Sequence, residues 1–323
     1  MDNIEKQKQM ALLHNQQGAS CKALGEYDKA LNHFEEAVNI YRNIYGSDRH
    51  ESIALVYCAI GTIYDDINDL EQAMKYYYTA QEIHEDVCGK DDYGIARYLN
   101  NMGNVYMKWA AFDESMYNKA LPLFERALEL TKKKYGDDYP DTATLYDNLG
   151  YIYMLIGQHS KAYDEYLKKA LDIRERVFKN EQHLDIATSY MHVGHYYSQT
   201  GNGRAALEFL KKALAVNISI YKTEDHPNIG ELYGALGEIS ASLQDFPEAL
   251  AYFKKNLSIY QRFLGENSSD TAYAYFNLGM VYHHMRNSAQ AMIHYQRALD
   301  IMGVELPANH PVLENIRKHM AML

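Results

Sequence analysis

Seven glycines recur along the chain at nearly equal intervals, and each stands in a version of one short pattern. The pattern is an aromatic residue, an apolar residue three positions later, the glycine directly after it, and a tyrosine three positions beyond. The glycines are Gly18, Gly61, Gly103, Gly150, Gly194, Gly237 and Gly279, and successive ones lie 42 to 47 residues apart. A period of this length over seven copies predicts a repeat architecture, in which each copy packs only against its neighbours.

The second half of each copy is also regular. In six copies an alanine stands twelve residues after the glycine, and a large apolar residue follows four positions later. These alanines are Ala30, Ala73, Ala162, Ala206, Ala249 and Ala291. Spacings of three and four place such residues on one face of a helix. Each repeat is therefore predicted to be two amphipathic helices, A and B, that press together at the glycine and alanine, with aromatic rings filling the remaining space.

The composition agrees with an all-α fold class. The chain has only 6 prolines and 19 glycines among 323 residues, so it contains few helix breakers. Its 30 tyrosines are far above the average, and we expect those of the pattern to pack in the core rather than to contact a ligand.

This pattern resembles the tetratricopeptide repeat (TPR), and in detail that of kinesin light chains. An ordinary TPR has about 34 residues, whereas the copies here are longer and share a linker, as in Tyr45-Gly46-Ser47-Asp48 and Tyr135-Gly136-Asp137-Asp138. His226-Pro227 and His310-Pro311 are expected to begin helices, because proline is tolerated in a first turn. The resemblance implies an α-solenoid, a right-handed superhelix of seven helix pairs plus a C-terminal capping helix.

The repeats are expected at about residues 1–48, 49–90, 91–138, 139–181, 182–225, 226–267 and 268–309, with the capping helix over 310–323. The more polar first repeat and the last helix suit the two ends of a complete solenoid. Kinesin light chains carry an N-terminal coiled coil that grips the motor heavy chain. Because this chain enters a repeat almost at once, we do not expect it to bind the motor.

Two repeats are irregular. Repeat three is about five residues longer than the others. Because proline is costly inside a helix, Pro122 predicts that helix B begins near Asn118 and that residues 112–117 form a protruding loop. This insertion is either neutral or an extra partner contact. Repeat four has one extra residue within Tyr163–Lys169, which predicts a helical bulge.

The resemblance also implies that the A helices line a concave groove that binds a peptide. By register, the predicted groove residues are Arg97, Asn100, Asn101, Asn104, Lys108, Thr144, Asp147, Asn148, Tyr151, His192, His195, Gln199, Asn277, His283 and His284. Asn101, Asn148 and Asn277 occupy one place in three repeats, and an amide can pair with any peptide backbone. Arg97 and Lys108 would favour an acidic segment. The alternative is that these side chains form a solvated polar stripe.

Other classes of function are disfavoured. The net charge of -11 argues against binding to nucleic acid or to an anionic membrane. Gly201–Ala206 matches G-x-G-x-x-A, but no strand is expected before it, so we predict no dinucleotide cofactor. The pair His192 and His195 and the pair His283 and His284 have no further ligand at metal-binding spacing. We therefore expect no metal and no catalysis.

The leading hypothesis is a protein-binding adaptor or scaffold that holds an extended peptide or helix in its groove. One alternative is a peptide-sensing regulatory protein that controls a bound effector, and another is self-assembly. Three cysteines in no CxxC pair, and no apparent secretory signal, suit a cytoplasmic protein.

Overall fold

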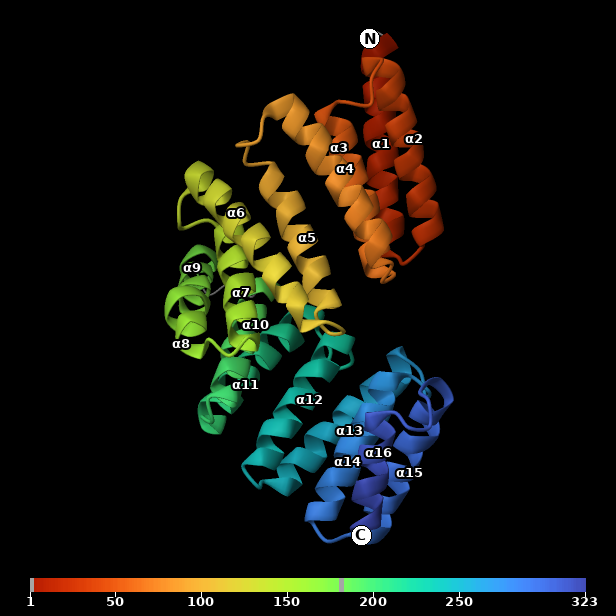
Figure 1. Cartoon of the computed structure of the whole chain (residues 1–323), viewed down its shortest axis with the longest axis vertical. Helices are drawn as coiled ribbons and strands as arrows, with labels where there is room; N and C mark the ends of the chain where they lie inside the picture. Colours follow the sequence, from red (N-terminus) through yellow and green to blue (C-terminus); the bar gives the residue numbers. More distant parts are fainter. Residues whose placement is uncertain (1–2, 180–182) are drawn as a thin grey trace. The chain divides into compact units, whose positions relative to one another are not determined.

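The computed structural model describes residues 3–179 and 183–323, and over these residues it is helical and contains no strand (Figure 1). The chain forms two compact units, residues 1–158 and 159–323. The first unit contains α1 (Asn3–Ala23), α2 (Tyr27–Tyr45), α3 (Glu51–Asp66), α4 (Leu70–Cys88), α5 (Ile95–Trp109), the 3-10 turn η1 (Glu114–Met116), α6 (Tyr117–Tyr135) and α7 (Pro140–Leu155).

The second unit begins with the helix of repeat four that follows α7. It contains α8 (His159–Lys161), η2 (Ala162–Leu167), α9 (Lys168–Phe178), α10 (Leu184–Gln199), α11 (Gly203–Tyr221), α12 (Pro227–Ser242), α13 (Phe246–Phe263), α14 (Ser269–His284), α15 (Ser288–Glu305) and α16 (Pro311–Ala321). The predicted boundary between repeats four and five, at residues 181 and 182, lies outside the described residues.

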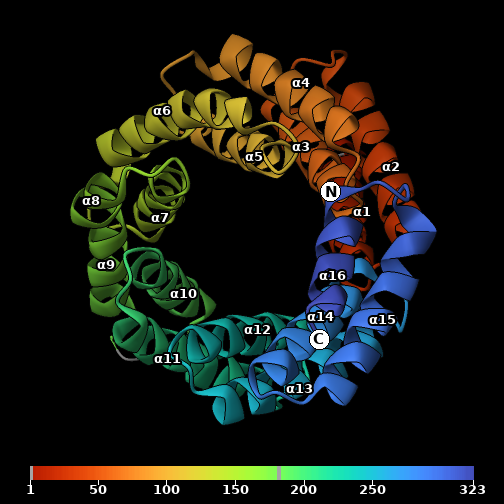
Figure 2. The same ribbon diagram turned by 60° about the horizontal axis from the view of Figure 1, so that its bottom comes forward.

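Within each unit, every helix packs against the next one along the chain, and alternate helices form two layers. In the first unit the A helices α1, α3, α5 and α7 lie on the inner side of the arc, and α2, α4 and α6 lie on its outer side (Figure 2). The A helices of the second unit, α10, α12 and α14, lie on its inner side in the same way. The predicted all-α architecture of helix pairs is confirmed.

The glycine of the pattern lies where the ring of helix B meets helix A. A Cβ added at Gly61 would stand 2.6 Å from Cε1 of Tyr77, and one added at Gly279 would stand 2.5 Å from Cδ1 of Tyr295. The same contact joins Gly18 to Phe34, Gly103 to Phe124, Gly194 to Leu210, and Gly237 to Phe253. The rings of Tyr77 and Tyr295 are at most 1 % exposed. The period therefore reflects the absence of a side chain where each pair packs most tightly.

The turn between helices A and B, which we call the corner, also recurs. A residue with positive φ stands seven positions after the pattern glycine in six repeats, at Gly25, Asn68, Gly157, Gly201, Gln244 and Arg286. In repeat five, Gly201 has φ +80° and Asn202 caps α11, its Oδ1 accepting the N–H of Ala205 at 3.2 Å. A helix lies on each side, so the G-x-G-x-x-A match is a corner, as the sequence indicated.

The two irregular repeats follow the prediction in part. Ala162–Leu167 is a π-helical segment, so the bulge in repeat four is confirmed: one extra residue is absorbed without ending the helix. In repeat three, residues 114–116 form a 3-10 turn that runs into α6 at Tyr117, so the predicted loop over 112–117 is only partly a loop. The predicted start of helix B near Asn118 is confirmed to within one residue, since α6 begins at Tyr117 and Pro122 lies in its second turn.

Histidines begin several A helices and the last helix. His226 and His310 are the N-caps of α12 and α16, each followed by proline at the first helical position, as predicted. In α16, Leu313 and Ile316 are each 1 % exposed against α15, while Glu314, Arg317 and Lys318 lie on the solvent side.

Candidate functional site

The predicted groove residues all lie on A helices, with five on α5, four on α7, three on α10 and three on α14. These helices form the inner layer of their own unit (Figure 2). The repeat register therefore brings the predicted residues to one layer in each unit.

The three asparagines at equivalent positions each bridge to the A helix of the preceding repeat. The side-chain nitrogen of Asn101 donates to Cys58 Sγ at 3.4 Å, and that of Asn148 donates to Asn100 Oδ1 at 2.9 Å. The side chain of Asn277 hydrogen-bonds Glu238 in the second unit. These amides are thus held in place by the neighbouring repeat, and each keeps further donor or acceptor capacity.

The structure corrects the expected pair of free basic side chains on α5. Lys108 donates to the Asp65 carboxylate at 2.7 Å and to the Asp65 carbonyl oxygen at 2.9 Å, so its charge is already compensated. Arg97 is exposed and forms no ion pair with any residue in the part of the chain that the structure describes. Only Arg97 remains as an uncompensated positive charge on this helix.

Some predicted residues are less accessible than expected. Asp147 is 1 % exposed, because residue 147 faces the packed side of α7. Burial lowers the pKa of His195 to about 4, and the nearby His192 acts in the same direction, so the His195 imidazole is neutral at physiological pH. His284 stacks on Phe246 with ring centroids 5.3 Å apart, whereas Gln199 is exposed.

The remaining predicted residues also belong to the inner layer. Asn104, Thr144, Tyr151 and His283 are half-buried. The ring of His283 meets that of His319 edge-on at 6.4 Å, which joins α14 to α16.

A pocket of about 370 Å³ opens in the first unit, and its walls come from α5, α6 and α7 and the segments before α5 and α7. Three of its lining residues, Arg97, Asn100 and Thr144, were predicted from the repeat register. Its other walls include three tyrosines, Tyr93, Tyr135 and Tyr139, and the carboxylate of Asp141. The pocket thus combines aromatic surface with one charge of each sign, neither of which is paired within the described residues.

A second pocket, of about 310 Å³, lies in the other unit between α12, α13 and α14. Predicted residues Asn277 and His284 line it, together with apolar side chains that include Phe276 and Met280. Its charged group is Glu238. Although this side chain touches solvent, the surrounding protein raises the pKa of the carboxyl group, while the hydrogen bond from Asn277 acts in the opposite direction.

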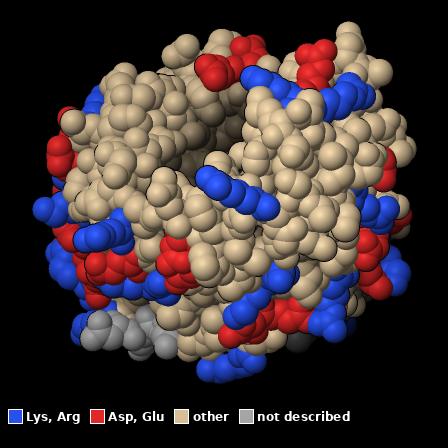
Figure 3. Space-filling model, turned by 90° about the horizontal axis from the view of Figure 1, so that it is seen from below, with Lys and Arg blue, Asp and Glu red and all other residues tan. Residues whose placement is uncertain are grey.

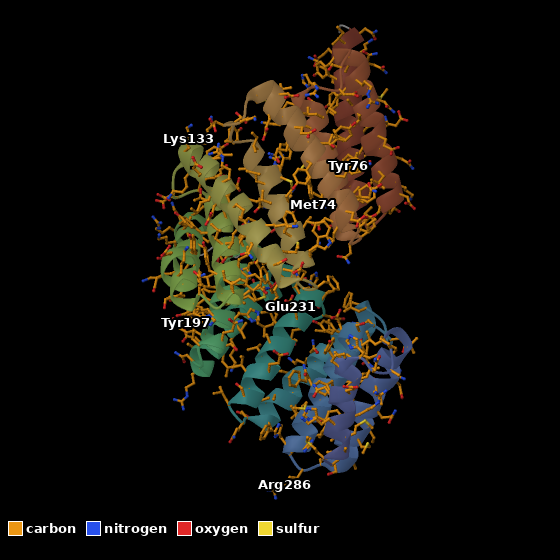
Figure 4. The ribbon with its side chains drawn as sticks, viewed as in Figure 1. Met74, Tyr76, Lys133, Tyr197, Glu231 and Arg286 are labelled. Carbon is orange, nitrogen blue, oxygen red and sulfur yellow. The ribbon has the colours of Figure 1, made fainter. Side chains whose placement is uncertain are left out.

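The sequence analysis missed the two glutamates of α12. Glu231 and Glu238 stand six residues before and one after Gly237, which are the offsets used to predict groove residues in other repeats. Figure 4 marks Glu231 on α12. Desolvation by the surrounding protein raises the pKa of Glu231; the nearby His192 acts in the opposite direction, and the carboxylate of Asp270 acts in the same direction as desolvation. Applying the same register to repeat six would have found both residues.

Charge is otherwise mixed over the surface. On the face shown in Figure 3, basic and acidic side chains lie next to each other rather than in separate patches. No helix among the described residues is long and apolar enough to cross a membrane. Within residues 3–179 and 183–323, no three His, Cys, Asp or Glu side chains converge as a metal site.

Comparison with known families identifies the repeats. A tetratricopeptide repeat model matches residues 9–83, 110–164 and 228–302, and a second tetratricopeptide repeat model matches residues 186–228. Both models describe a repeat, and neither describes an enzyme.

Individual relatives are more distant. A clustered mitochondria protein homolog of Culex quinquefasciatus is 28 % identical over 184 residues, which cover 57 % of this chain and 13 % of that protein. The protein KINESIN LIGHT CHAIN-RELATED 2 of Arabidopsis thaliana is 24 % identical over 190 residues, covering 47 % and 28 %. The matched part of the chain therefore spans less than a third of the length of these relatives.

Among solved structures, the apo form of the quorum sensor NprR from B. thuringiensis superposes with a TM-score of 0.67 at 15 % identity, covering 90 % of this chain and 76 % of that one. This similarity supports the fold alone. The predicted resemblance to TPR proteins and to the kinesin-light-chain group is confirmed. The chain belongs to the tetratricopeptide repeat family.

Proposed function

We propose that this protein is an adaptor that binds an extended peptide or a helix of a partner protein along the inner layer of A helices. Tetratricopeptide repeats serve protein–protein interaction, and the proposal specifies where the partner binds. One observation carries it: each unit has a pocket on this layer, and residues predicted from the repeat register line both pockets.

The asparagines support this proposal because they are already oriented. Asn148 is hydrogen-bonded to Asn100, and Asn101 to Cys58, so neither amide must be immobilised when a peptide arrives. Side chains that are held in the bound conformation lose less entropy on binding. Their unused donors and acceptors could then pair with a peptide backbone whatever its sequence.

The two pockets favour different side chains of the partner. In the first unit, Arg97 offers an uncompensated guanidinium, which suits a carboxylate of the partner. In the second unit, Glu238 stands among apolar groups such as Met280, which suits a lysine or arginine whose aliphatic stem packs there. We therefore expect the partner to carry an acidic residue for one unit and a basic residue for the other.

Selection from a random displayed-peptide library on the full chain tests the proposal. The wild-type protein should enrich peptides, and Arg97→Ala should reduce the acidic content of the enriched set. Glu238→Gln should reduce its basic content, and Asn101→Ala, Asn148→Ala and Asn277→Ala combined should weaken binding of every selected peptide. If no peptides are enriched, or if the triple variant binds them as the wild type does, the groove does not bind peptides.

A second candidate is a peptide-sensing regulatory protein, which is favoured by the structural similarity to a quorum sensor. A sensor changes conformation when its peptide binds, whereas an adaptor need not. Small-angle X-ray scattering with and without a selected peptide separates the two, because only the sensor should change its radius of gyration. We also propose a reducing, cytoplasmic setting, in which Cys21, Cys58 and Cys88 stay as free thiols.

A further inference from the structure

The corner of repeat three differs from the other six. None of residues 109–117 has a positive φ, and Ala110, where the left-handed residue would stand, has φ -62°. The inserted residues lead instead into η1. Asp113 caps η1, because its side chain accepts the backbone N–H of Ser115 at 3.0 Å. This route places Phe112 on the surface, where its side chain is 86 % exposed.

An exposed apolar residue is ordinary at a corner, but a second aromatic residue beside it is not. Leu243 shows the usual role: its Cδ2 lies 3.0 Å from where a Cβ on Gly203 would stand, so one corner packs on the preceding corner. Trp109 occupies the equivalent position in repeat three and is half-buried. Phe112 is additional, and no described contact in the core accounts for it.

Trp109 and Phe112 line a shallow, open hollow of about 640 Å³ together with residues at the corner of repeat two. The hollow is lined by Ile67, Asn68, Asp69, Leu70, Glu71, Trp109 and Phe112. We call this surface, with the residues that line it, the corner hollow. Ile67 adds to its apolar surface, since its side chain is 46 % exposed.

The charge around the corner hollow is mainly acidic. Asp69 and Glu71 line it, and Asp113 and Glu114 stand next to Phe112 in the sequence. None of these four carboxylates forms an ion pair with a residue that the structure describes.

The basic side chains of the neighbouring corners are already engaged. Lys22 pairs with Asp66 at 3.1 Å, and Lys108 pairs with Asp65 at 2.7 Å. The Nζ of Lys119 lies over the ring of Tyr106 at 5.6 Å from its centroid. Asp69 also caps α4, and the charge of Lys119 acts on Asp113, so these two carboxylates are partly compensated. The surface at this corner therefore presents aromatic rings beside an excess of acidic side chains, with Glu71 and Glu114 unpaired among the described residues.

We infer that the corner hollow is a second docking surface, separate from the inner layer of A helices, for a basic segment of a partner protein that carries a large apolar side chain. The apolar side chain packs between Trp109 and Phe112. Flanking lysine or arginine residues meet Asp69, Glu71 and Glu114, and a guanidinium can also lie over an aromatic face. On this proposal, the insertion in repeat three is an extra partner contact, which is the second of the two roles that the sequence analysis allowed.

Trp109 makes this proposal directly measurable, because it is the single tryptophan of the chain. The probe is a short synthetic peptide with one phenylalanine between two pairs of arginines, and its match replaces the arginines with glutamates. Titrating the basic peptide into the full chain should produce a saturable change in tryptophan emission that weakens with added salt. The acidic peptide should produce none.

Variants locate the site. Phe112→Ser should weaken binding of the basic peptide about tenfold or more, as expected for a central aromatic contact. Glu71→Gln combined with Glu114→Gln should weaken it and flatten the salt dependence. Leu24→Ser removes an apolar side chain that is also highly exposed, 76 %, at another corner, and it should have no effect.

Circular dichroism checks that each variant stays folded. Arg97→Ala should leave this titration unchanged, so failure of the inner-layer proposal does not affect the result. The inference is overturned if the basic peptide gives no saturable change, if Phe112→Ser binds it equally, or if the acidic peptide binds as well.

Discussion

The imidazole of His226 lies flat against the ring of Tyr221, with ring centroids 3.6 Å apart and planes within 12° of parallel. In this stacked orientation, Nδ1 of His226 accepts the backbone N–H of Asn228 at 3.2 Å. His50 repeats both contacts in the first unit, stacking on Tyr45 at 3.4 Å and accepting from Ser52 at 3.1 Å. One residue thus packs on the end of helix B and caps the following helix A.

Removing this cap should destabilise the second unit. We expect His226→Ala to lower the free energy of unfolding by about 1 kcal/mol, the usual loss for an N-cap acceptor. His226→Asn supplies another acceptor and should recover most of that loss. The measurement is urea unfolding of the full chain. If His226→Asn is as unstable as His226→Ala, the stacking on Tyr221 rather than the cap stabilises the linker.

Acid should destabilise the folded chain through its histidines. Burial lowers the pKa values of several imidazoles below the ordinary 6.5, and the value for His195 falls to about 4. These residues are His50, His195, His226, His294 and His319. Between the two pKa values the unfolded chain binds more protons than the folded chain. Their contribution is therefore complete above pH 6.5 and is lost as the pH falls toward the folded-state values.

Urea unfolding at a series of pH values between 7.5 and 4 checks this prediction, with His195→Gln as the matched variant. The variant should lose less stability than the wild type across this range, since a glutamine at this position does not titrate. Glu231 and Glu238 act in the opposite sense, because their raised pKa values favour proton binding by the folded chain just above pH 4.5. If the free energy of unfolding of the wild type does not decrease when the pH is lowered below 6.5, the histidines do not have the lowered pKa values described above.

The fold was predictable because its main constraint is local. Gly61 and Tyr77 stand 16 residues apart in the sequence, and the same contact recurs in other pairs, so the period exposes it. The bulge at Ala162–Leu167 was predictable for the same reason, as a one-residue break in that period.

The site was less predictable because it depends on contacts between repeats. The register placed Arg97 and Lys108 on the same helix, but only the structure shows that Asp65 of the preceding repeat compensates Lys108. The burial of Asp147 likewise depends on how neighbouring helices pack around α7, which the position of a residue along its own helix does not reveal. Phe112 lies in an insertion, where the period gives no information.

The close contacts between the pattern glycines and helix B predict that one added methyl group lowers the stability of the chain. Gly61→Ala should destabilise the chain by about 1–3 kcal/mol, because the new Cβ would overlap the ring of Tyr77. The control is Gly303→Ala, on the exposed side of α15, where an added Cβ meets no atom within 4 Å. That change should stabilise by about 0.5–1 kcal/mol, since alanine is the better helix former. Thermal unfolding of both variants separates overpacking from helix propensity. If both changes shift the stability equally, the contact with Tyr77 does not require glycine at position 61.

Arg174 and Lys108 allow a comparison of a buried and an exposed cation. Arg174 is 3 % exposed, and its Nη1 donates to the Asp185 carbonyl oxygen at 2.8 Å and to Ser189 Oγ at 2.6 Å. Arg174→Met would remove the donor to the buried Ser189 Oγ, and we expect the free energy of unfolding to fall by about 1–3 kcal/mol.

The side chain of Lys108 is 44 % exposed, so water can replace it at Asp65 after Lys108→Met, and the loss should stay below about 1 kcal/mol. Urea unfolding of the two variants should therefore show a large shift for Arg174→Met and a small one for Lys108→Met. Comparable shifts would mean that the Arg174 site admits water, and that burial does not determine the cost of losing a donor in this chain.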